Sequence, residues 1–151
     1  MRSWVATRAS ALLCLVGAAA CSVSRWPVEG PLGAPFGIRW DGALPDLHRG
    51  VDILVPTGTP VAAMSDGRVR FAGTMEAFGV VVWLDHGDDV LTVYAHLSEL
   101  RVETGGQLAK GDIIGLSGSS GNATGPHLHF EIWRRGLQID PVSMLGGPPE
   151  P

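Results

Sequence analysis

One stretch of the chain alternates strictly between polar and apolar side chains, and this pattern predicts a β-strand. It reads Gly125-Pro126-His127-Leu128-His129-Phe130-Glu131-Ile132. Successive side chains of a strand point to opposite faces, so the two histidines share a face with Glu131 and the apolar residues form the other face. The outer face of a half-buried strand ordinarily carries Thr, Lys or Gln. Two neighbouring imidazoles on it therefore indicate metal coordination.

The remaining composition is typical of a small, mostly β domain. The 151 residues include 21 glycines and 11 prolines, with 45% hydrophobic and 17% charged residues. No segment has long helical periodicity, and β-branched clusters alternate with turn residues. We predict an all-β fold, an antiparallel β-sheet sandwich or barrel with little helix. The expected strands are 51–54, 61–63, 67–72, 80–85, 91–95, 113–116, 127–133 and 137–139.

The N-terminus has the features of a secretion signal. Arg2 and Arg8 precede an uncharged, mostly apolar run that ends in Ala18-Ala19-Ala20-Cys21 and is too short to span a bilayer. The sequence satisfies an ordinary small-x-small cleavage site and also resembles a bacterial lipobox, in which the cysteine is lipidated. Both interpretations place the cut before Cys21. We favour lipidation of Cys21, hence an exported lipoprotein anchored in a membrane and facing the periplasm or cell wall.

Four segments follow from this pattern. We expect a signal peptide at 1–20, a tether at 21–27, one folded domain at 28–145 and a disordered tail at 146–151. Within the domain, residues 28–37 are too rich in Pro and Gly for a helix or a central strand, so an ordered loop along the domain edge is expected. The tether Ser22 to Pro27 would extend at most about 20 Å.

Charge and cysteine content exclude two classes of function. Removing Arg2 and Arg8 leaves nine basic against fifteen acidic residues, a net charge of −6. A nucleic-acid binder would carry a basic face with interleaved aromatic residues, which is absent here. Cys14 would leave with the signal peptide, so the mature chain keeps only Cys21 and forms no internal disulfide. A terminal cysteine before a tether also has no scaffold to orient a catalytic base.

A second stretch, His48-Arg49-Gly50-Val51-Asp52, adds two candidate metal ligands. Gly50 and the β-branched residues after it favour a loop running into a strand over a helix. His48 and Asp52 can then converge on His129, which gives two neutral imidazoles and one carboxylate. This set fits a catalytic zinc site, which uses three protein ligands and leaves the fourth position to water. Zn²⁺ in such a site polarises a carbonyl and lowers the pKa of its water toward about 7.

A third stretch, Thr92-Val93-Tyr94-Ala95-His96-Leu97, brings further polar groups. Alternation places Thr92, Tyr94 and His96 on one face, so Tyr94 and His96 are expected beside the substrate. The glycine-rich segment 115–125 precedes His127 and is expected to form a wall of the substrate groove.

Two other polar residues, Glu131 and His86, are not assigned to the metal site. Glu131 either orients a histidine or pairs with Arg49 or Arg134 at the surface. His86 lies in a turn and is expected to be structural.

Together these motifs resemble the lysostaphin-type, LytM-like zinc endopeptidases. The matching segments are His48 to Asp52, Tyr94-Ala95-His96-Leu97 and Gly125 to Glu131, in that order, within a likeness that runs from about Pro35 to Leu145. The resemblance implies a β fold of the duplicated hybrid motif type. It implies that one zinc ion is bound by His48, Asp52 and His129, while His96 and His127 form the catalytic pair.

The resemblance also implies a substrate, the peptide cross-links and stem peptides of bacterial peptidoglycan. On this hypothesis His127 is the general base and His96 donates a hydrogen bond to the oxyanion. Two other functions stay open. A non-catalytic relative of the same fold would activate another wall hydrolase through a regulatory protein contact, but such relatives typically lack metal ligands. A plain wall-binding module would need neither catalytic histidine.

Overall fold

The computed structural model describes residues 24–41, 44–147 and 149. The signal peptide, Cys21 and the start of the tether lie outside these residues. The described part contains these elements in chain order: β1 (Leu32–Ala34), β2 (Gly37–Asp41), β3 (Leu44–His48), β4 (Val51–Ile53), β5 (Pro60–Ala62), β6 (Gly67–Met75), β7 (Gly79–Gly87), β8 (Val90–Leu100), β9 (Gln107–Leu108), β10 (Ile113–Ser117), β11 (Leu128–Arg134), β12 (Leu137–Ile139) and α1 (Pro141–Leu145).

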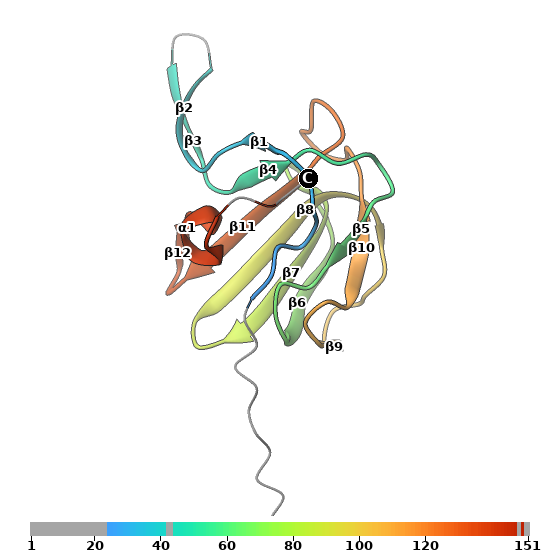
Figure 1. Cartoon of the computed structure of the whole chain (residues 1–151). Coiled ribbons are helices and arrows are strands. Elements are labelled where there is room, and N and C mark those ends of the chain that lie inside the picture. Colours follow the sequence, from blue (N-terminus) through green and yellow to red (C-terminus); the bar gives the residue numbers. More distant parts are fainter. Residues whose placement is uncertain (1–23, 42–43, 148, 150–151) are drawn as a thin grey trace, which may run out of the picture.

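The strands confirm the predicted all-β antiparallel class. The main sheet has the order β1-β4-β11-β8-β7-β6-β9, with β12 beside β11 and with β10 joining β5 to β8 (Figure 1). Each of the eight predicted strands is present, with boundaries that differ by a few residues. The predicted edge loop at 28–37 contains one short strand, β1, which pairs with β4 at the edge of the sheet.

The long strand β8 organises the sheet. Its first half, Val90 to Ala95, pairs with β11, and its second half, from Leu97 onward, pairs with β10. On its other side it pairs with β7 along most of its length. The change of partner occurs at His96, whose φ of 60° lies in the left-handed region. Because β8 bends there, the sheet folds back on itself and encloses the core.

The core lies against one face of this sheet. Leu128, Phe130 and Ile132 of β11 are fully buried, as the alternation of that strand predicts. They pack with side chains of β4, β5, β7, β8 and β10 in one cluster. The apolar face of the central strand therefore holds the two halves of the sheet together, and the opposite face of the same strand is left for polar side chains.

A two-stranded hairpin of β2 and β3 projects from this body (Figure 1). On one of its faces Arg39 and Asp46 form an ion pair of 2.9 Å. On the other face Ile38 and Leu47 are paired across the strands, and their side chains are 75% and 54% exposed. The hairpin ends at His48, which is buried, so its base is fixed to the sheet and its length extends beside the predicted site.

Both ends of the described domain are more firmly packed than expected. Arg25 N–H donates to the carbonyl of Met64, and the ring of Trp26 lies 6.1 Å from that of Phe130. The indole N–H of Trp26 donates to the carbonyl of Gly147 at 3.0 Å. Residues of the expected tether, Arg25 and Trp26, and of the expected tail, Gly147, thus bond to each other or to the domain, while the four-segment division stays a prediction.

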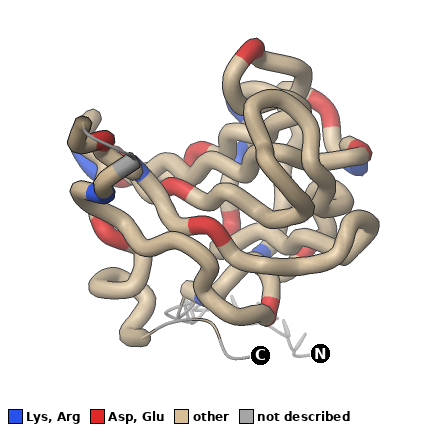
Figure 2. Tube along the Cα trace, turned by 90° about the horizontal axis from the view of Figure 1, so that it is seen from above, with Lys and Arg blue, Asp and Glu red and all other residues tan. Residues whose placement is uncertain are grey.

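The surface carries interleaved charges. Acidic and basic segments alternate around the molecule in the view of Figure 2, and no broad basic face is visible in it.

The one helix in the described part, α1, has five residues. No helix there is long and apolar enough to cross a membrane.

Candidate metal centre and active site

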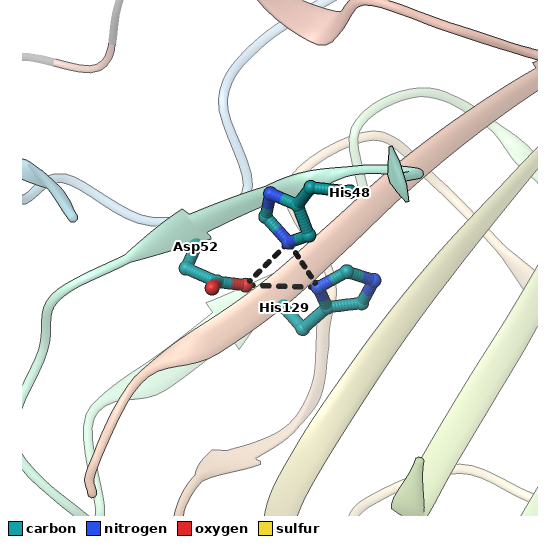
Figure 3. A group of neighbouring side chains, drawn as sticks. All are labelled: His48, Asp52 and His129. Atoms are coloured by element: carbon teal, nitrogen blue, oxygen red, sulfur yellow. Dashed lines mark hydrogen bonds and ion pairs between the residues drawn. The ribbon is translucent and has the colours of Figure 1, made fainter. Parts of the chain in front are cut away.

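Three side chains converge on one point at the edge where β3, β4 and β11 meet. Figure 3 shows His48, Asp52 and His129 pointing toward one another. The His48 Nε2 atom lies 3.2 Å from both Asp52 Oδ1 and His129 Nδ1, and the last two atoms are 2.8 Å apart. Three ligands of a tetrahedral zinc ion, with bonds of about 2.0–2.1 Å, lie about 3.3 Å from each other. The size of this triangle therefore fits a zinc ion.

The convergence depends on a close crossing of two chain segments. Asp52 is paired directly with His129 in the β4–β11 ladder, so these two ligands are neighbours by register. His48 joins them because the β3–β4 connection passes against β11. A Cβ atom on Gly50 would lie only 2.4 Å from the carbonyl oxygen of Phe130. Only glycine allows this approach, which explains its place between the two ligands.

Hydrogen bonds outside the triangle select the ligand atom of each histidine. The Nδ1–H group of His48 donates to the carbonyl of Pro35 at 2.7 Å, which leaves its Nε2 lone pair for the metal. The Nε2 of His129 lies 3.0 Å from Glu131 Oε1, which leaves Nδ1 for the metal. Such outer partners fix the tautomer and orientation of a metal-binding histidine. Glu131 is 2% exposed, so it orients His129 and does not act as a surface partner of an arginine.

A further residue, Trp133, extends this chain of hydrogen bonds. Its indole N–H donates to Glu131 Oε2 at 2.6 Å, so both carboxylate oxygens of Glu131 are engaged. The sequence analysis did not identify Trp133, although its position two residues after Glu131 on the same strand face was a usable signal. Burial of a polar side chain costs free energy unless it is hydrogen-bonded, so these two bonds stabilise Glu131 in its buried position.

Burial and hydrogen bonding shift the pKa values of Asp52 and His129 in opposite directions. Burial alone would raise the pKa of Asp52, but hydrogen bonds and charge from His129 and His48 hold it well below its usual value. Burial would lower the pKa of His129, yet its bonds to Asp52 and Glu131 raise it to about 9. Asp52 is therefore a carboxylate at neutral pH, and His129 would have to give up a proton to hold a metal ion.

Two more histidines face the same cleft. His127 Nδ1–H donates to the carbonyl of Gly125 at 2.8 Å, and His96 Nδ1–H donates to the carbonyl of Ser120 at 2.7 Å. Since a carbonyl only accepts, each neutral ring keeps an unprotonated Nε2. The two rings lie 4.8 Å apart, and His127 Nε2 is 3.7 Å from Asp52 Oδ1. Burial lowers the pKa of His96 despite its bond to Ser120.

The prediction that Tyr94 projects with His96 is wrong. Tyr94 is fully buried in the core, where its hydroxyl accepts hydrogen bonds from Met64 N–H and Thr92 Oγ1–H, both at 3.0 Å. Burial raises the pKa of this phenol to about 12. Regular alternation would send His96 to the same side, but the left-handed backbone at His96 turns its side chain to the His129 side.

The cleft has a volume of about 270 Å³. Asn122 and Thr124 of the glycine-rich loop line it, which agrees with the expected wall, and Phe78 lines it opposite, with its ring 6.0 Å from that of His129. No feature of the sequence had indicated Phe78. His86, in contrast, bonds to the Asp66 carbonyl and to Thr92 and does not line the cleft.

Comparisons with known proteins agree with this geometry. The family model for peptidase family M23 matches residues 46–141. A DD-carboxypeptidase/endopeptidase, Mpg of Neisseria meningitidis, is 40% identical over 121 residues, 79% of this chain and 28% of that protein. The murein hydrolase activator EnvC of Escherichia coli is 37% identical over 121 residues, 80% of this chain and 28% of that protein. The chain thus spans little more than a quarter of the length of these relatives.

Solved structures show the same fold. The catalytic domain of lysostaphin from Staphylococcus simulans is 33% identical, with a TM-score of 0.71 over 78% of this chain and 93% of that one. A zinc-containing peptidase from Vibrio cholerae is 30% identical, with a TM-score of 0.72 over 78% of this chain and 38% of that one. The resemblance to lysostaphin-type enzymes is confirmed.

The first prediction separates metal ligands from the other histidines. His129→Ala and Asp52→Ala should each lower zinc affinity roughly tenfold or more, since each removes one vertex of the triangle. His127→Ala should keep its zinc, because His127 lies outside that triangle. Zinc content after dialysis and the zinc-dependent rise in Tm are the measurements. Equal zinc loss in all three variants would contradict the assignment.

Proposed function

Because the chain belongs to peptidase family M23, we propose that it is a zinc-dependent endopeptidase that hydrolyses the peptide cross-links of bacterial peptidoglycan. One observation carries this proposal. A single cleft contains a complete triangle of metal ligands and, beside it, two histidines whose Nε2 atoms are proton acceptors. The name of the related murein hydrolase activator supports peptidoglycan, which is murein, as the substrate class, and the name of the related DD-carboxypeptidase/endopeptidase supports peptide-bond cleavage.

A regulatory role is the second candidate. The similarity to a murein hydrolase activator is almost as high as the similarity to the endopeptidase. An activator works through a protein contact and needs no oriented metal ligands. Here the ligands are not only present but also held in the right tautomers by Pro35 and Glu131. Burial of these polar groups costs free energy, and a regulator would gain nothing from it. The arrangement therefore favours the enzyme.

The metal would be held by His48 Nε2, Asp52 Oδ1 and His129 Nδ1. Zinc bound there supplies Lewis-acid polarisation of the scissile carbonyl and acidifies a water molecule. Asp52 and Glu131 provide negative charge at and behind the site, so the ligands can carry a divalent cation without leaving a large net positive charge buried. Phe78 lines the cleft with its ring 6.0 Å from that of His129, so an apolar side chain stands beside the ligands.

His127 is placed to move the proton. Its Nε2 lone pair lies 3.7 Å from Asp52 Oδ1, next to the ligand triangle. It takes a proton from the attacking water as the new C–O bond forms, and it returns this proton to the amine nitrogen as the C–N bond breaks. The bond from Nδ1–H to Gly125 holds the ring in position through both transfers.

His96 acts on the other side of the carbonyl. Its neutral ring is unprotonated at Nε2 because Nδ1–H is held by Ser120. The ring therefore takes up one proton from solvent before the reaction, donates it in a hydrogen bond to the carbonyl oxygen, and keeps it through both proton transfers by His127. The left-handed backbone and the bond to Ser120 fix this ring before the substrate arrives, and such preorganisation is the main source of electrostatic stabilisation in an active site.

Isolated sacculi test the proposed function. The purified protein with zinc should release peptide-containing fragments by cutting peptide bonds, and chelator should stop the release. His127→Ala should release fragments about 10² to 10⁴ times more slowly, because it lacks the general base. Mass spectrometry of the fragments identifies the bond. An inactive zinc-loaded protein that instead stimulates a second wall hydrolase would establish the regulatory role.

His96→Ala should mainly lower kcat. If His96 stabilises the oxyanion, kcat should fall by a factor on the order of 10² to 10³ while KM changes little. Steady-state kinetics on a soluble cross-linked stem peptide provide the measurement. A variant that raises KM and leaves kcat intact would place His96 in substrate binding.

We also propose that Cys21 is lipidated and anchors the enzyme to its membrane. Support comes from the signal-like sequence before Cys21. Since Arg25 is already bonded to the domain, the chain from Cys21 to Arg25 extends at most about 14 Å. Several lipid chains hold a protein firmly, whereas one chain binds marginally. The enzyme would therefore reach only the wall that lies close to this membrane.

The anchor is tested by fractionation and by mass spectrometry of the mature N-terminus. A lipid mass on Cys21 in the membrane fraction is expected. Cys21→Ser should release a soluble protein or block processing, because the hydroxyl does not accept the lipid. An unmodified Cys21 in the soluble fraction would show ordinary cleavage after Ala20 and would remove the limit on reach.

A further inference from the structure

The sheet face that carries the active site continues as an aromatic surface. Val81, Val93 and Ala95 are fully buried on this face. The larger side chains that cover them are Phe71, Phe78, Trp83, Leu91 and Trp133. Phe78 also lines the catalytic cleft. The aromatic surface therefore runs without a break from the cleft toward the turn between β7 and β8.

A second and larger hollow lies at the far end of this surface. Its volume is about 800 Å³, and it is lined by Trp83, Leu91 and Trp133. Trp83 of β7 is opposite Val93, and Trp133 of β11 is opposite Leu91, so the two indoles flank β8 on the same face. Their rings are 6.3 Å apart and inclined by 32°. Both residues are partly exposed, and they form what we call the tryptophan platform.

Charged side chains of both signs border the platform. Arg70 and Asp85 lie at one side, with 3.7 Å between Nη1 and Oδ2 and side chains that are 66% and 44% exposed. Asp88, Asp89 and Arg135 come from the two hairpin turns at the end, which are joined by a hydrogen bond from Arg135 N–H to the Asp89 carbonyl. The rim therefore offers several donors and acceptors around a flat apolar floor.

One polar atom of the platform has no partner in the protein. Among the residues that the structure describes, the indole N–H of Trp83 is buried without a hydrogen-bond acceptor. Buried donors are almost always paired, and an exception calls for an explanation. This donor is enclosed by protein atoms, so it marks the platform as unusual but is not itself a contact for a ligand that stacks on the exposed ring faces.

The platform is connected to the metal centre. Trp133 donates to Glu131, and Glu131 in turn bonds His129. Trp133 follows His129 by four residues on the same strand face, a distance of about 13 Å along β11. An extended peptide of about four residues spans the same distance.

We propose that the tryptophan platform binds an N-acetylated amino-sugar ring of the glycan strand from which the scissile stem peptide extends. This proposal deepens the proposed function and rests on it for the link between sugar and peptide. A pyranose ring presents an apolar C–H face that stacks on indole, while its hydroxyl and acetamido groups suit carboxylate and guanidinium partners. The spacing lets one substrate occupy both places, with its sugar on the platform and its peptide over the zinc ligands.

A protein partner fits this surface less well. A stable protein interface buries about 800 Å² on each side around an apolar centre. The apolar floor here consists of two indoles and Leu91, and it is closed by charges on two sides. A small polyhydroxylated ligand matches both the size and the mixed polarity.

The binding test uses soluble N-acetylglucosamine oligosaccharides, which carry the sugar chemistry without any peptide. Titration of the zinc-loaded protein, followed by calorimetry, should give saturable binding. Trp83→Ala should weaken it about tenfold, the effect of losing one stacked ring. Trp40→Ala is the matched control, because that tryptophan is 73% exposed on the β2–β3 hairpin, none of whose residues line the platform hollow. Arg70→Ala, an exposed rim change that keeps the fold, should weaken binding severalfold.

Absence of saturable binding to the unaltered protein would overturn the proposal, and so would equal affinities of Trp83→Ala and Trp40→Ala. A second measurement compares kcat/KM for a stem peptide with and without its attached disaccharide. The sugar-linked substrate should be preferred about tenfold, through KM, and Trp83→Ala should lose this preference. Equal cleavage of both substrates without oligosaccharide binding would reject the platform and leave the peptidase intact. Oligosaccharide binding without any cleavage would support the platform and reject the proposed function.

Discussion

The site depends on the contact between the β3–β4 connection and the backbone of β11. His48 and Asp52 reach His129 only because Gly50 lets the chain pass where any side chain would collide with the carbonyl of Phe130. The same strand, β11, carries the core on its other face through Leu128, Phe130 and Ile132. Packing of the apolar face therefore fixes the position of β11 in the fold. The close crossing at Gly50 then brings His48 and Asp52 to His129 on the other face of that strand. Geometry of the metal triangle and stability of the core are thus linked through one strand.

A second constraint is the bend in β8. Up to Ala95 this strand belongs to the β11 side of the sheet, and from Leu97 it belongs to the β10 side. The residue at the change, His96, has the left-handed backbone that such a change of direction requires. A non-glycine residue with positive φ costs free energy and is found most often where function demands it. Here the bend turns an imidazole from the core side to the cleft.

Buried polar groups behind the ligands complete the site. A buried carboxylate such as Glu131 is costly unless it is paired, and both of its oxygens are paired, one with His129 and the other with Trp133. The result is a hydrogen-bonded row of side chains on one face of β11, from His129 through Glu131 to Trp133. This row connects the catalytic cleft, which His129 lines, with the hollow at the tryptophan platform, which Trp133 lines. Both hollows are therefore bordered by residues of β11.

The sequence by itself determined the β class, the eight strands that carry clear alternation, and the types of side chain at the site. Alternation is a local property, and it correctly assigned Leu128 and Phe130 to the core and His129 to the opposite face. It failed at Tyr94, which lies in the core while His96 lines the cleft as expected, because one left-handed residue exchanges the faces of a strand without changing its pattern. The packing of Arg25 to Pro27, the role of Glu131 and the tryptophan platform were decided only by the tertiary structure. Each depends on contacts between segments far apart in the chain, which no local period records.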